Sequence, residues 1–238
     1  MASPRAGGRN LRNLHARIVD ELGRLIVEGV YGAEQPIVPE DVGRRFQASR
    51  TVVREALRVL ESKGMVTARP RVGTWTLPPE KWDAIDPDVI AWRVQGPDGA
   101  HHLRELLELR LTIEPQAARM AAQHRRPDEL ATMAAAYELM ADAVERQDRI
   151  AFEKADCVFH AALVRASGNA LIAQLEGPVV SALRARADLT EVSDHVSEHA
   201  LVLHSRLLTM VLAKNADGAE SACHRLLETV SPYHSPAS

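Results

Sequence analysis

The sequence predicts a mainly α protein in two parts: a small N-terminal domain of three helices and a β-hairpin, then an all-α antiparallel helical bundle. Apolar residues recur at helical spacing along most of the chain, and β-prone residues gather in only two short runs. Charge divides the chain in the same way. Residues 1–77 contain 13 Lys and Arg against 8 Asp and Glu, whereas residues 78–238 contain 16 against 24. A basic module joined to an acidic domain is typical of a protein that binds nucleic acid.

The composition limits the class of protein further. The 238 residues are 46% hydrophobic and 26% charged, which are ordinary globular values and exclude wholesale disorder. No stretch approaches the roughly 20 apolar residues of a membrane span, and the basic N-terminus lacks the apolar core of a signal peptide. With Cys157 and Cys223 as the only cysteines, the fold needs no disulfide framework. We therefore expect a cytoplasmic protein with no membrane association.

The N-terminal elements follow from helix start and stop signals. Pro39 suits the first position of a short helix, Ser49 is a good N-cap, and Gly32 and Gly64 end helical stretches. The expected elements are a disordered tail over residues 1–10, helices over 11–30, 40–46 and 50–62, and strands over 65–68 and 74–77. Three helices followed by a two-stranded flap form a winged helix-turn-helix over residues 11–77.

Residues 78–99 form a junction, and all three tryptophans, Trp75, Trp82 and Trp92, are assigned to this region. Large aromatic faces favour burial, so we expect this junction to pack against one or both domains. The remaining domain, residues 100–232, reads as helices separated by short breaks, with no strand-like alternation. The expected helices span 101–124, 127–147, 149–167, 169–188, 195–214 and 216–230. These lengths and short connections favour an antiparallel helical bundle.

The helix over 50–62 carries the strongest candidate binding residues. Arg50 and Arg54 lie one turn apart on its outer face, where two guanidinium groups suit bidentate contacts with guanine. Ser49 and Thr51, together with the free N–H groups of the first turn, suit contacts with phosphates. An ordinary amphipathic helix with a solvated arginine face has the same pattern. The short helix, tight turn and hairpin around this helix favour the DNA-reading interpretation.

Residues 48–74, ASRTVVREALRVLESKGMVTARPRVGT, resemble the recognition helix and wing of the GntR family of bacterial regulators, in its FadR-like branch. The resemblance covers residues 11–77 and implies that Arg50 and Arg54 read bases. Some members have a third DNA-contacting arginine early in the second helix, where this chain has Glu40. An acidic residue is unable to take that role, so the contact must pass to another side chain.

Five further residues complete the expected DNA-binding set. Arg44 or Arg45 is expected to supply the phosphate contact that the family's third arginine makes. Arg69 and Arg71 at the wing tip, with Gly73 beside them, are expected to enter the minor groove, where narrow A·T-rich stretches attract guanidinium groups. A solvated hairpin is the alternative for the wing.

The helical domain resembles the effector-binding domain of the same branch, the FCD type, over residues 100–230. Arg110 lies among apolar residues, and a buried arginine needs an anionic partner. That partner is either Glu114, four residues on and on the same helical face, or the carboxylate of a bound ligand. The family's use of an arginine at this place favours the ligand.

Asp156 and His160 are four residues apart, so both point from one face of a helix and form a suitable ligand pair for a divalent ion. An i,i+4 ion pair is the plainer alternative. In FCD domains such a pair joins two later histidines around a metal; His204 aligns with the first, and Leu226 stands where the second belongs. The resemblance implies either zinc or a similar divalent metal, or a metal-free pocket in which the same side chains bind the effector by hydrogen bonds.

The absent fourth ligand has several possible substitutes. Cys223, one turn before Leu226, or a water molecule would complete the coordination sphere. His224 points to a different side of the helix and is a poor replacement. His195 and His199 form another pair four residues apart, which a solvated helix face explains better.

A finer resemblance lies in the junction. Residues 69–74, Trp82 and residues 86–92 (DPDVIAW) are similar to the galactonate-type regulators, which repress sugar-acid operons. Because one recognition helix covers only a half-site, we expect a homodimeric repressor on a palindromic double-stranded DNA operator. A small carboxylate effector such as a sugar acid would release it.

Two other classes of function fit parts of the pattern. A ligand-independent architectural DNA-binding protein has no need of a buried arginine beside an Asp/His cluster. A helical metalloenzyme with an accessory DNA-binding domain needs Glu-x-x-His on two helices for a di-iron site, and no glutamate here precedes a histidine by three residues. The chain also lacks a Gly-rich phosphate loop and a G-x-S-x-G elbow. We therefore expect a regulator and not an enzyme.

Overall fold

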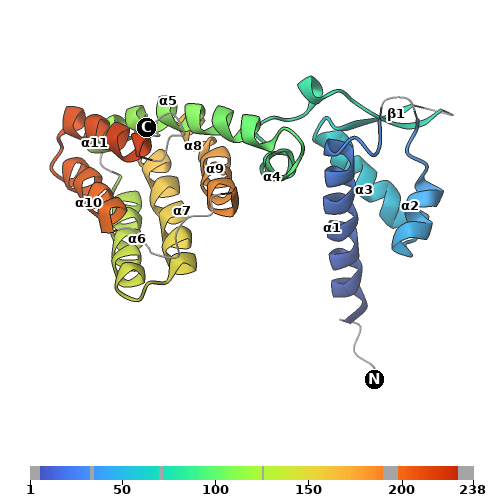
Figure 1. The fold of residues 1–238 in the computed structure, drawn as a ribbon, viewed down its shortest axis with the longest axis horizontal. Helices are drawn as coiled ribbons and strands as arrows, with labels where there is room; N and C mark the ends of the chain where they lie inside the picture. The colour runs from blue at the N-terminus through green and yellow to red at the C-terminus, as the bar shows by residue number, and fades with distance from the viewer. Residues whose placement is uncertain (1–5, 33–34, 70–71, 125, 190–197, 230–238) are drawn as a thin grey trace, which may run out of the picture. The chain divides into compact units, whose positions relative to one another are not determined.

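The computed structural model describes residues 6–32, 35–69, 72–124, 126–189 and 198–229. Its contacts divide the chain into two compact units, Met1–Gly99 and Ala100–Ser238 (Figure 1). Helices dominate both units, and the strands found within the described residues lie in the first, so the predicted mainly α fold is confirmed. None of the helices in these ranges is long and apolar enough to cross a membrane.

The first unit is a winged helix-turn-helix with an added helix. Its elements are α1 (Ala6–Val27), α2 (Pro39–Phe46), α3 (Arg50–Ser62), β1 (Val66–Arg69), β2 (Gly73–Thr76), the 3-10 turn η1 (Pro79–Lys81) and α4 (Pro87–Gln95). The strands β1 and β2 pair antiparallel, with Val66 opposite Thr76, and together form the wing. A bridge between Ile37 and Thr74 ties the segment before α2 to the wing.

Helix α1 differs from its prediction at both ends. It begins at Ala6, inside the segment predicted to be a disordered tail, because adding residues to an existing helix costs much less than starting one. It ends at Val27, because Gly29 adopts a left-handed φ of 76° that closes the helix. Gly29 therefore ends this helix, and the assignment of its end to Gly32 was wrong.

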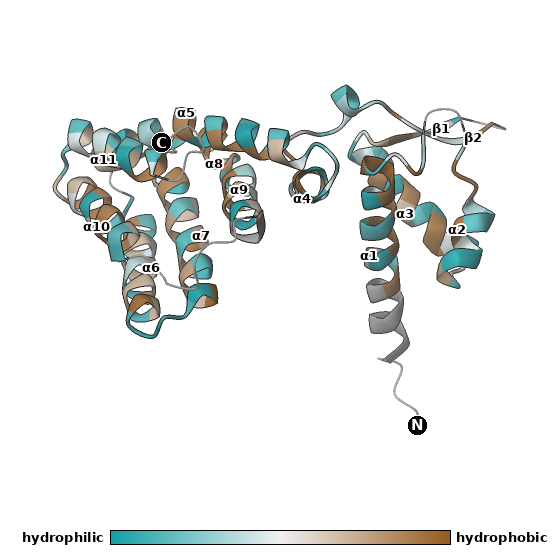
Figure 2. Cartoon of the chain, in the orientation of Figure 1, coloured by the Kyte–Doolittle hydropathy of each residue, from teal (hydrophilic) through white to brown (hydrophobic). Residues whose placement is uncertain are grey.

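The core of the first unit joins its helices and the wing. Its buried side chains include Ile18, Leu22 and Ile26 of α1, Val42 of α2, Val53, Leu57 and Leu60 of α3, Met65 and Val66 around the start of β1, and Val89 and Trp92 of α4. The apolar stripes that predicted α1 and α3 are thus their buried faces. Figure 2 shows apolar and polar residues alternating around both helices, as this one-sided burial requires.

Two of the three tryptophans assigned to the junction, Trp82 and Trp92, pack into this core, whereas Trp75 belongs to β2. Trp92 is 4% exposed, and its indole Nε1 donates to the Asp20 carboxylate of α1 at 2.9 Å. Gly23 leaves room for the ring, because a Cβ at that position would lie 2.5 Å from it. Trp82 is partly buried against the same core and donates to the carbonyl of Leu77. Within the first unit, the junction is therefore an integral part and not a free linker.

The second unit is an all-α bundle. Its helices are α5 (Gly99–His124), α6 (Pro127–Glu145), α7 (Arg149–Ala166), α8 (Ala170–Ala173), α9 (Glu176–Leu189), α10 (Glu198–Leu212) and α11 (Ala216–Glu228). Helix α7 packs beside α6 and α9, and α10 packs beside α6 and α11 (Figure 1). Many buried core residues are alanines, among them Ala118, Ala121, Ala155, Ala162 and Ala222, and such small side chains let helix axes approach closely.

The single helix predicted over 169–188 is wrong, because this segment forms two helices. Helix α8 ends at Ala173, and α9 begins at Glu176. Pro178 lies in the first turn of α9, where its missing N–H leaves no bond unmade. In an uninterrupted helix the same ring would clash with the carbonyl of Gln174, four residues earlier, which favours the break at residues 174 and 175.

Candidate functional site

The turn between α2 and α3 positions the exposed start of α3. Gln47 adopts a left-handed φ of 51°, and the N–H of Ala48 donates to the carbonyl of Gly43 at 2.9 Å. A Cβ on Gly43 would lie 3.1 Å from the Ala48 carbonyl oxygen, so glycine suits this tight turn. The Ser49 hydroxyl then accepts from the N–H of Val52 and caps α3 as predicted. The first turn of α3 is therefore presented by a well-defined backbone.

The outer face of α3 holds the residues predicted to contact DNA. Arg50, Thr51 and Arg54 are exposed, whereas Val53 and Leu57 of the same helix are buried. Arg54 has no carboxylate partner among the residues that the structure describes. A groove of about 340 Å³ runs between α3 and the wing, and Arg54, Arg58 and Arg69 all line it together with Glu61. This face offers several guanidinium groups to an anionic partner.

Three further arginines of the helix-turn-helix are paired with carboxylates. Arg44 pairs with Asp41 within α2, and Arg45 reaches Glu21 of α1 at 3.0 Å. Arg50 pairs with Glu40 across the helix-turn-helix, its Nε lying 3.5 Å from Oε1 of the carboxylate. All of these side chains are substantially exposed to solvent. Such pairs are weak, so a DNA phosphate is able to replace the carboxylate beside Arg44 or Arg45.

The wing residues are placed as follows. The guanidinium of Arg69 stacks over the Trp75 ring, 5.8 Å from its centroid. Gly73 has a φ of 115°, and a Cβ there would lie 3.0 Å from the Pro36 ring, so a larger residue would strain the start of β2. Arg71, predicted to lie at the wing tip, falls outside the described residues.

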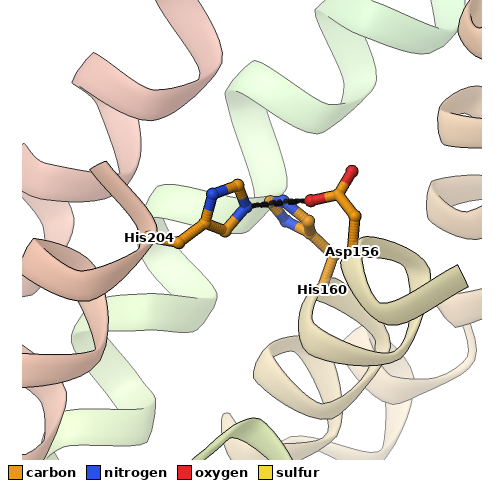
Figure 3. A group of neighbouring side chains, drawn as sticks. All are labelled: Asp156, His160 and His204. Atoms are coloured by element: carbon orange, nitrogen blue, oxygen red, sulfur yellow. Dashed lines mark hydrogen bonds and ion pairs between the residues drawn. The ribbon is translucent and has the colours of Figure 1, made fainter. Parts of the chain in front are cut away.

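In the second unit, Asp156 and His160 of α7 meet His204 of α10 (Figure 3). Nε2 of His204 lies 2.9 Å from Oδ1 of Asp156, and Nε2 of His160 lies 3.4 Å from the same oxygen. The two Nε2 atoms are 3.3 Å apart. All three side chains are buried, and their potential ligand atoms lie within 4.8 Å of one another. The structure thus brings together the three residues predicted to bind a metal or effector.

The outer nitrogens of both rings fix how the inner nitrogens face the cluster. Nδ1 of His204 lies 2.8 Å from the Ala200 carbonyl, and Nδ1 of His160 contacts the Glu114 carboxylate. Because a carbonyl or carboxylate oxygen only accepts, each Nδ1 carries a proton, and in the neutral form of each ring Nε2 presents a lone pair. With both rings neutral, Oδ1 of Asp156 finds no hydrogen-bond donor among the described residues, whereas a protonated ring directs an Nε2–H at this oxygen. Three acceptors converge on one point, which is the arrangement that a cation stabilises.

Arg110 and Glu114 form a second layer beside this cluster. Arg110 is 1% exposed, and its Nε donates to Glu114 at 2.5 Å, so the intrahelical partner considered from the sequence is present. Glu114 also contacts His160, a role that the sequence pattern did not suggest. Nη2 of Arg110 lies 3.4 Å from the His160 ring, while Nη1 is buried without a partner within the described residues. One arginine donor is therefore available to a ligand.

Neighbouring charges in this cluster favour the ionised forms of Glu114, Asp156 and His160 although all three side chains are buried. Burial alone would raise the pKa of Glu114, but the Arg110 guanidinium and the His160 ring lower it to about 2. Burial also opposes ionisation of Asp156, yet His160 and His204 hold its pKa well below the usual value. Burial lowers the pKa of His160, and the Glu114 and Asp156 carboxylates outweigh it and raise that pKa above its ordinary value. The carboxylates remain ionised and attract a proton or a metal ion.

The other residues considered as metal ligands do not lie in the Asp156–His160–His204 cluster. Cys223 is buried but is not a member of the ligand cluster found among the described residues. Leu226 is buried in the apolar core of the bundle, so its position supplies no ligand. His199 and His224 are exposed, and His195 falls outside the described residues. Asp156, His160 and His204 are therefore the three candidate ligands that the described residues bring together.

Arg186 of α9 was missed by sequence reasoning. Burial lowers its pKa, while the nearby Asp156 carboxylate opposes that effect and Arg110 adds to it. A second cation therefore lies within electrostatic range of the cluster. The available signal was an arginine flanked by alanines, but its approach to α7 depends on how α9 packs.

Comparisons with known proteins identify both units. Residues 14–75 match the family described as bacterial regulatory proteins, gntR family, and residues 105–229 match the FCD domain. The galactonate operon transcriptional repressor of Escherichia coli (strain K12) is 30% identical over 208 residues, which cover 87% of this chain and 90% of that repressor. The chain belongs to the GntR family of bacterial regulators. It is a ligand-responsive, DNA-binding transcriptional regulator with an FCD effector-binding domain.

Further GntR relatives agree with this assignment. The HTH-type transcriptional regulator LutR of Bacillus subtilis (strain 168) is 32% identical over 182 residues, covering 74% of this chain and 80% of LutR. Among solved structures, Streptococcus agalactiae GntR has a TM-score of 0.53 at 21% identity and covers 92% of this chain and 99% of that one. E. coli McbR/YncC has a TM-score of 0.54 at 17% identity, covering 91% and 94%. These structures share the fold, and the relatives named here are transcriptional regulators.

Proposed function

We propose that this GntR regulator is a homodimeric repressor that leaves a palindromic operator when a small carboxylate, such as a sugar acid, binds its FCD domain. One recognition helix covers only a half-site, so a dimer on a two-fold symmetric operator follows from the geometry of the motif. The FCD domain acts as a sensor and not as an enzyme. The protein acts in the cytoplasm, where operator DNA lies.

The observation that carries the ligand proposal is the unpartnered Nη1 of buried Arg110. Leaving a buried donor unpaired costs about 1–3 kcal/mol, and a ligand carboxylate supplies the missing acceptor. Glu114 accepts from Nε of this guanidinium, so Nη1 can donate to a ligand while the pair with Glu114 is kept. The E. coli relative is named as a repressor of a galactonate operon, and galactonate is a small carboxylate of this kind.

A divalent metal such as zinc fits the cluster next to this arginine. Asp156, His160 and His204 would hold it, because with both rings neutral two imidazole lone pairs and one carboxylate oxygen converge there. When bound, the ion supplies a fixed positive charge that attracts an anionic oxygen of the ligand. Glu114 and the Ala200 carbonyl orient the two rings by accepting from Nδ1. With Leu226 unable to coordinate, the open positions remain for water or ligand.

The DNA contacts follow from the exposed face of the first unit. Arg50 and Arg54 read base edges in the major groove, and the start of α3 bonds phosphates through backbone N–H groups. The supporting residues proposed here are Ser49, Thr51, Arg44, Arg45, Arg69, Arg71 and Gly73. The groove between α3 and the wing, lined by arginines, supports the approach of an anionic backbone to this face.

The test measures DNA affinity by fluorescence anisotropy as galactonate and other sugar acids are added. The probe is a duplex that the wild-type protein selects from a randomised library. Linkage predicts that the effective acid weakens DNA binding by about 5- to 150-fold. His204→Ala is expected to lose this response while keeping its DNA affinity, and His199→Ala, on an exposed position of the same helix, is expected to keep both.

Two results would contradict the proposal. If no sugar acid changes the affinity of the wild-type protein, the cluster has no sensing role for this class of ligand. A full response in His204→Ala would remove the Asp/His cluster from the ligand site. Analytical ultracentrifugation of the protein with its selected duplex measures the stoichiometry, and a single protomer per palindrome would overturn the dimer.

A further inference from the structure

The residue that departs most clearly from the family pattern on the DNA-binding face is Glu40. It occupies the first turn of α2, where the resemblance leads one to expect a DNA-contacting arginine. Its carboxylate lies 3.5 Å from Nε of Arg50 at the start of α3. The acidic side chain therefore stands beside one of the two arginines that the proposed function assigns to base reading.

The geometry of this pair leaves the reading edge of Arg50 open. A guanidinium has one N–H on Nε and four on its two terminal nitrogens. The closest approach of Glu40 is to Nε, so the carboxylate occupies the inner side of the group. The fork formed by Nη1 and Nη2 is the part that grips guanine O6 and N7. The Arg50 side chain is 75% exposed, so this fork is free to reach a base.

DNA phosphates compete with bases for the Arg50 guanidinium, and the negative charge of Glu40 affects this competition. A flexible arginine at a helix start is attracted to phosphates of any sequence. A carboxylate at the same place repels phosphate and attracts the guanidinium, so it disfavours the non-specific position of Arg50. The arrangement differs from that of Arg54, which has no such neighbour in the described part of the chain.

We propose that Glu40 is a specificity-determining, positioning residue: it holds Arg50 through Nε in the orientation that reads guanine and keeps it from neighbouring phosphates. The proposal rests on the proposed function of α3 as the DNA-reading helix. Glu40 thereby lowers the affinity for random DNA and raises the preference for one base pair. Where the family arginine adds a DNA contact, Glu40 instead makes the base contact of Arg50 more selective.

The chain offers a matched control in Asp41. Asp41 is the next residue of the same helical turn and is also exposed and paired with an arginine, but its partner is Arg44 and not Arg50. Glu40→Gln and Asp41→Asn each remove one negative charge with little change of shape. Both variants are expected to bind random duplex more tightly, because each removes repulsion from phosphates. Only Glu40→Gln is expected to change base preference.

The experiment uses the full-length protein and the duplex that wild type selects from a randomised library. Affinities are measured for this duplex, for its single base-pair variants and for a random duplex. Glu40→Gln is expected to reduce discrimination at one base pair by about fivefold, at the lower end of what one bidentate arginine contact contributes. That base pair is expected to be the one at which Arg50→Ala loses its preference. In the double variant Glu40→Gln/Arg50→Ala, the two losses are expected not to add, because Glu40 acts through Arg50.

Each other result counts against the proposal in a distinct way. Equal effects of Glu40→Gln and Asp41→Asn on all duplexes would reduce Glu40 to a general charge. Additive losses in the double variant would mean that Glu40 contacts a base by itself. If Arg50→Ala changes no base preference, the reading role of Arg50 fails first, and the positioning role of Glu40 fails with it.

Discussion

The DNA-binding face and the buried cluster of the FCD domain both consist of arginines, carboxylates and their neighbours, but they differ in exposure. The pairs Arg44–Asp41, Arg45–Glu21 and Arg50–Glu40 lie at the surface. Arg110 and Glu114 have side chains only 2% and 0% exposed. Water and salt screen the first group, whereas burial strengthens both the attractions and the penalties in the second. The surface pairs of Arg44 and Arg45 are therefore exchangeable for DNA phosphates, and the buried pairs form a fixed scaffold for a ligand.

Glu114→Gln is expected to have the largest effect among the tests of this difference between buried and exposed pairs. It leaves buried Arg110 and His160 without the carboxylate that contacts both. Removing one partner of a buried ion pair costs about 3–5 kcal/mol, so we expect a loss of that size in the free energy of unfolding by urea. Asp142→Asn is the control, because Asp142 forms an exposed i,i+4 pair with Arg146 in the same domain at 2.7 Å. Its loss is expected to stay below about 1 kcal/mol. Equal losses would mean that burial does not separate the two kinds of pair.

The second test adds zinc to the metal-free protein. A metal at one hundred times its dissociation constant stabilises the folded state by about 2.7 kcal/mol. For a chain of this size each kcal/mol raises Tm by about 2–4 °C, so thermal melting should shift upward by several degrees. His204→Ala is expected to lose the shift and His199→Ala to keep it. Zinc binding of undiminished strength by His204→Ala in calorimetry would place the metal elsewhere.

The third test concerns Arg54, an exposed arginine of α3 with no carboxylate partner among the described residues. Arg54→Ala is expected to weaken binding to the selected duplex by about 1–3 kcal/mol and to relax preference at one base pair. Arg58→Ala serves as control, since Arg58 lies one turn later, pairs with Glu55 at 2.7 Å and lines the same groove. It should weaken all duplexes slightly and evenly. A change of base preference in Arg58→Ala alone would move the reading site along α3.

The smallest effect on the unfolding free energy is expected for Lys63, whose ion pairs are of intermediate burial. Lys63 at the end of α3 has a side chain only 11% exposed, and its Nζ lies 2.7 Å from Asp86 and 2.9 Å from Asp88, at the start of α4. The same ammonium stands over the Trp92 ring at 6.0 Å. We expect Lys63→Met to reduce the unfolding free energy by about 1–2 kcal/mol, between the values for exposed and buried pairs. Lys81→Met, at an exposed position, should change the unfolding free energy little. A similar loss in the two variants would mean that the pairs of Lys63 with Asp86 and Asp88 do not stabilise the fold.

Sequence patterns predicted much of this fold because their causes are local. The stripe through Ile18 and Leu22 and the Ser49 cap depend on residues within one or two turns, and the structure has both. The errors are of the same local kind. Gly29 and Pro178 act as helix boundaries here, and choosing among several glycines and prolines requires knowing which backbone angles the packing imposes.

The candidate site could be predicted only in part. Asp156 and His160 share a face by their spacing, but His204 joined them through the family resemblance and not through any local pattern. The contact of Glu114 with His160 joins residues 46 positions apart, and Arg186 comes from yet another helix. Such contacts depend on which helices pack together and at what depth.

The sequence by itself determined the two-part architecture, the helical faces, the exposed arginines of α3 and the family. Each depends on periodicity, capping or a motif, which act over a few neighbouring residues. Only the tertiary structure decided which charges meet: Glu40 with Arg50, Glu114 with both Arg110 and His160, and Lys63 with the start of α4. The physical reason is that the strength of a charge pair depends on distance and burial, and both are set by the packing of elements distant in the chain.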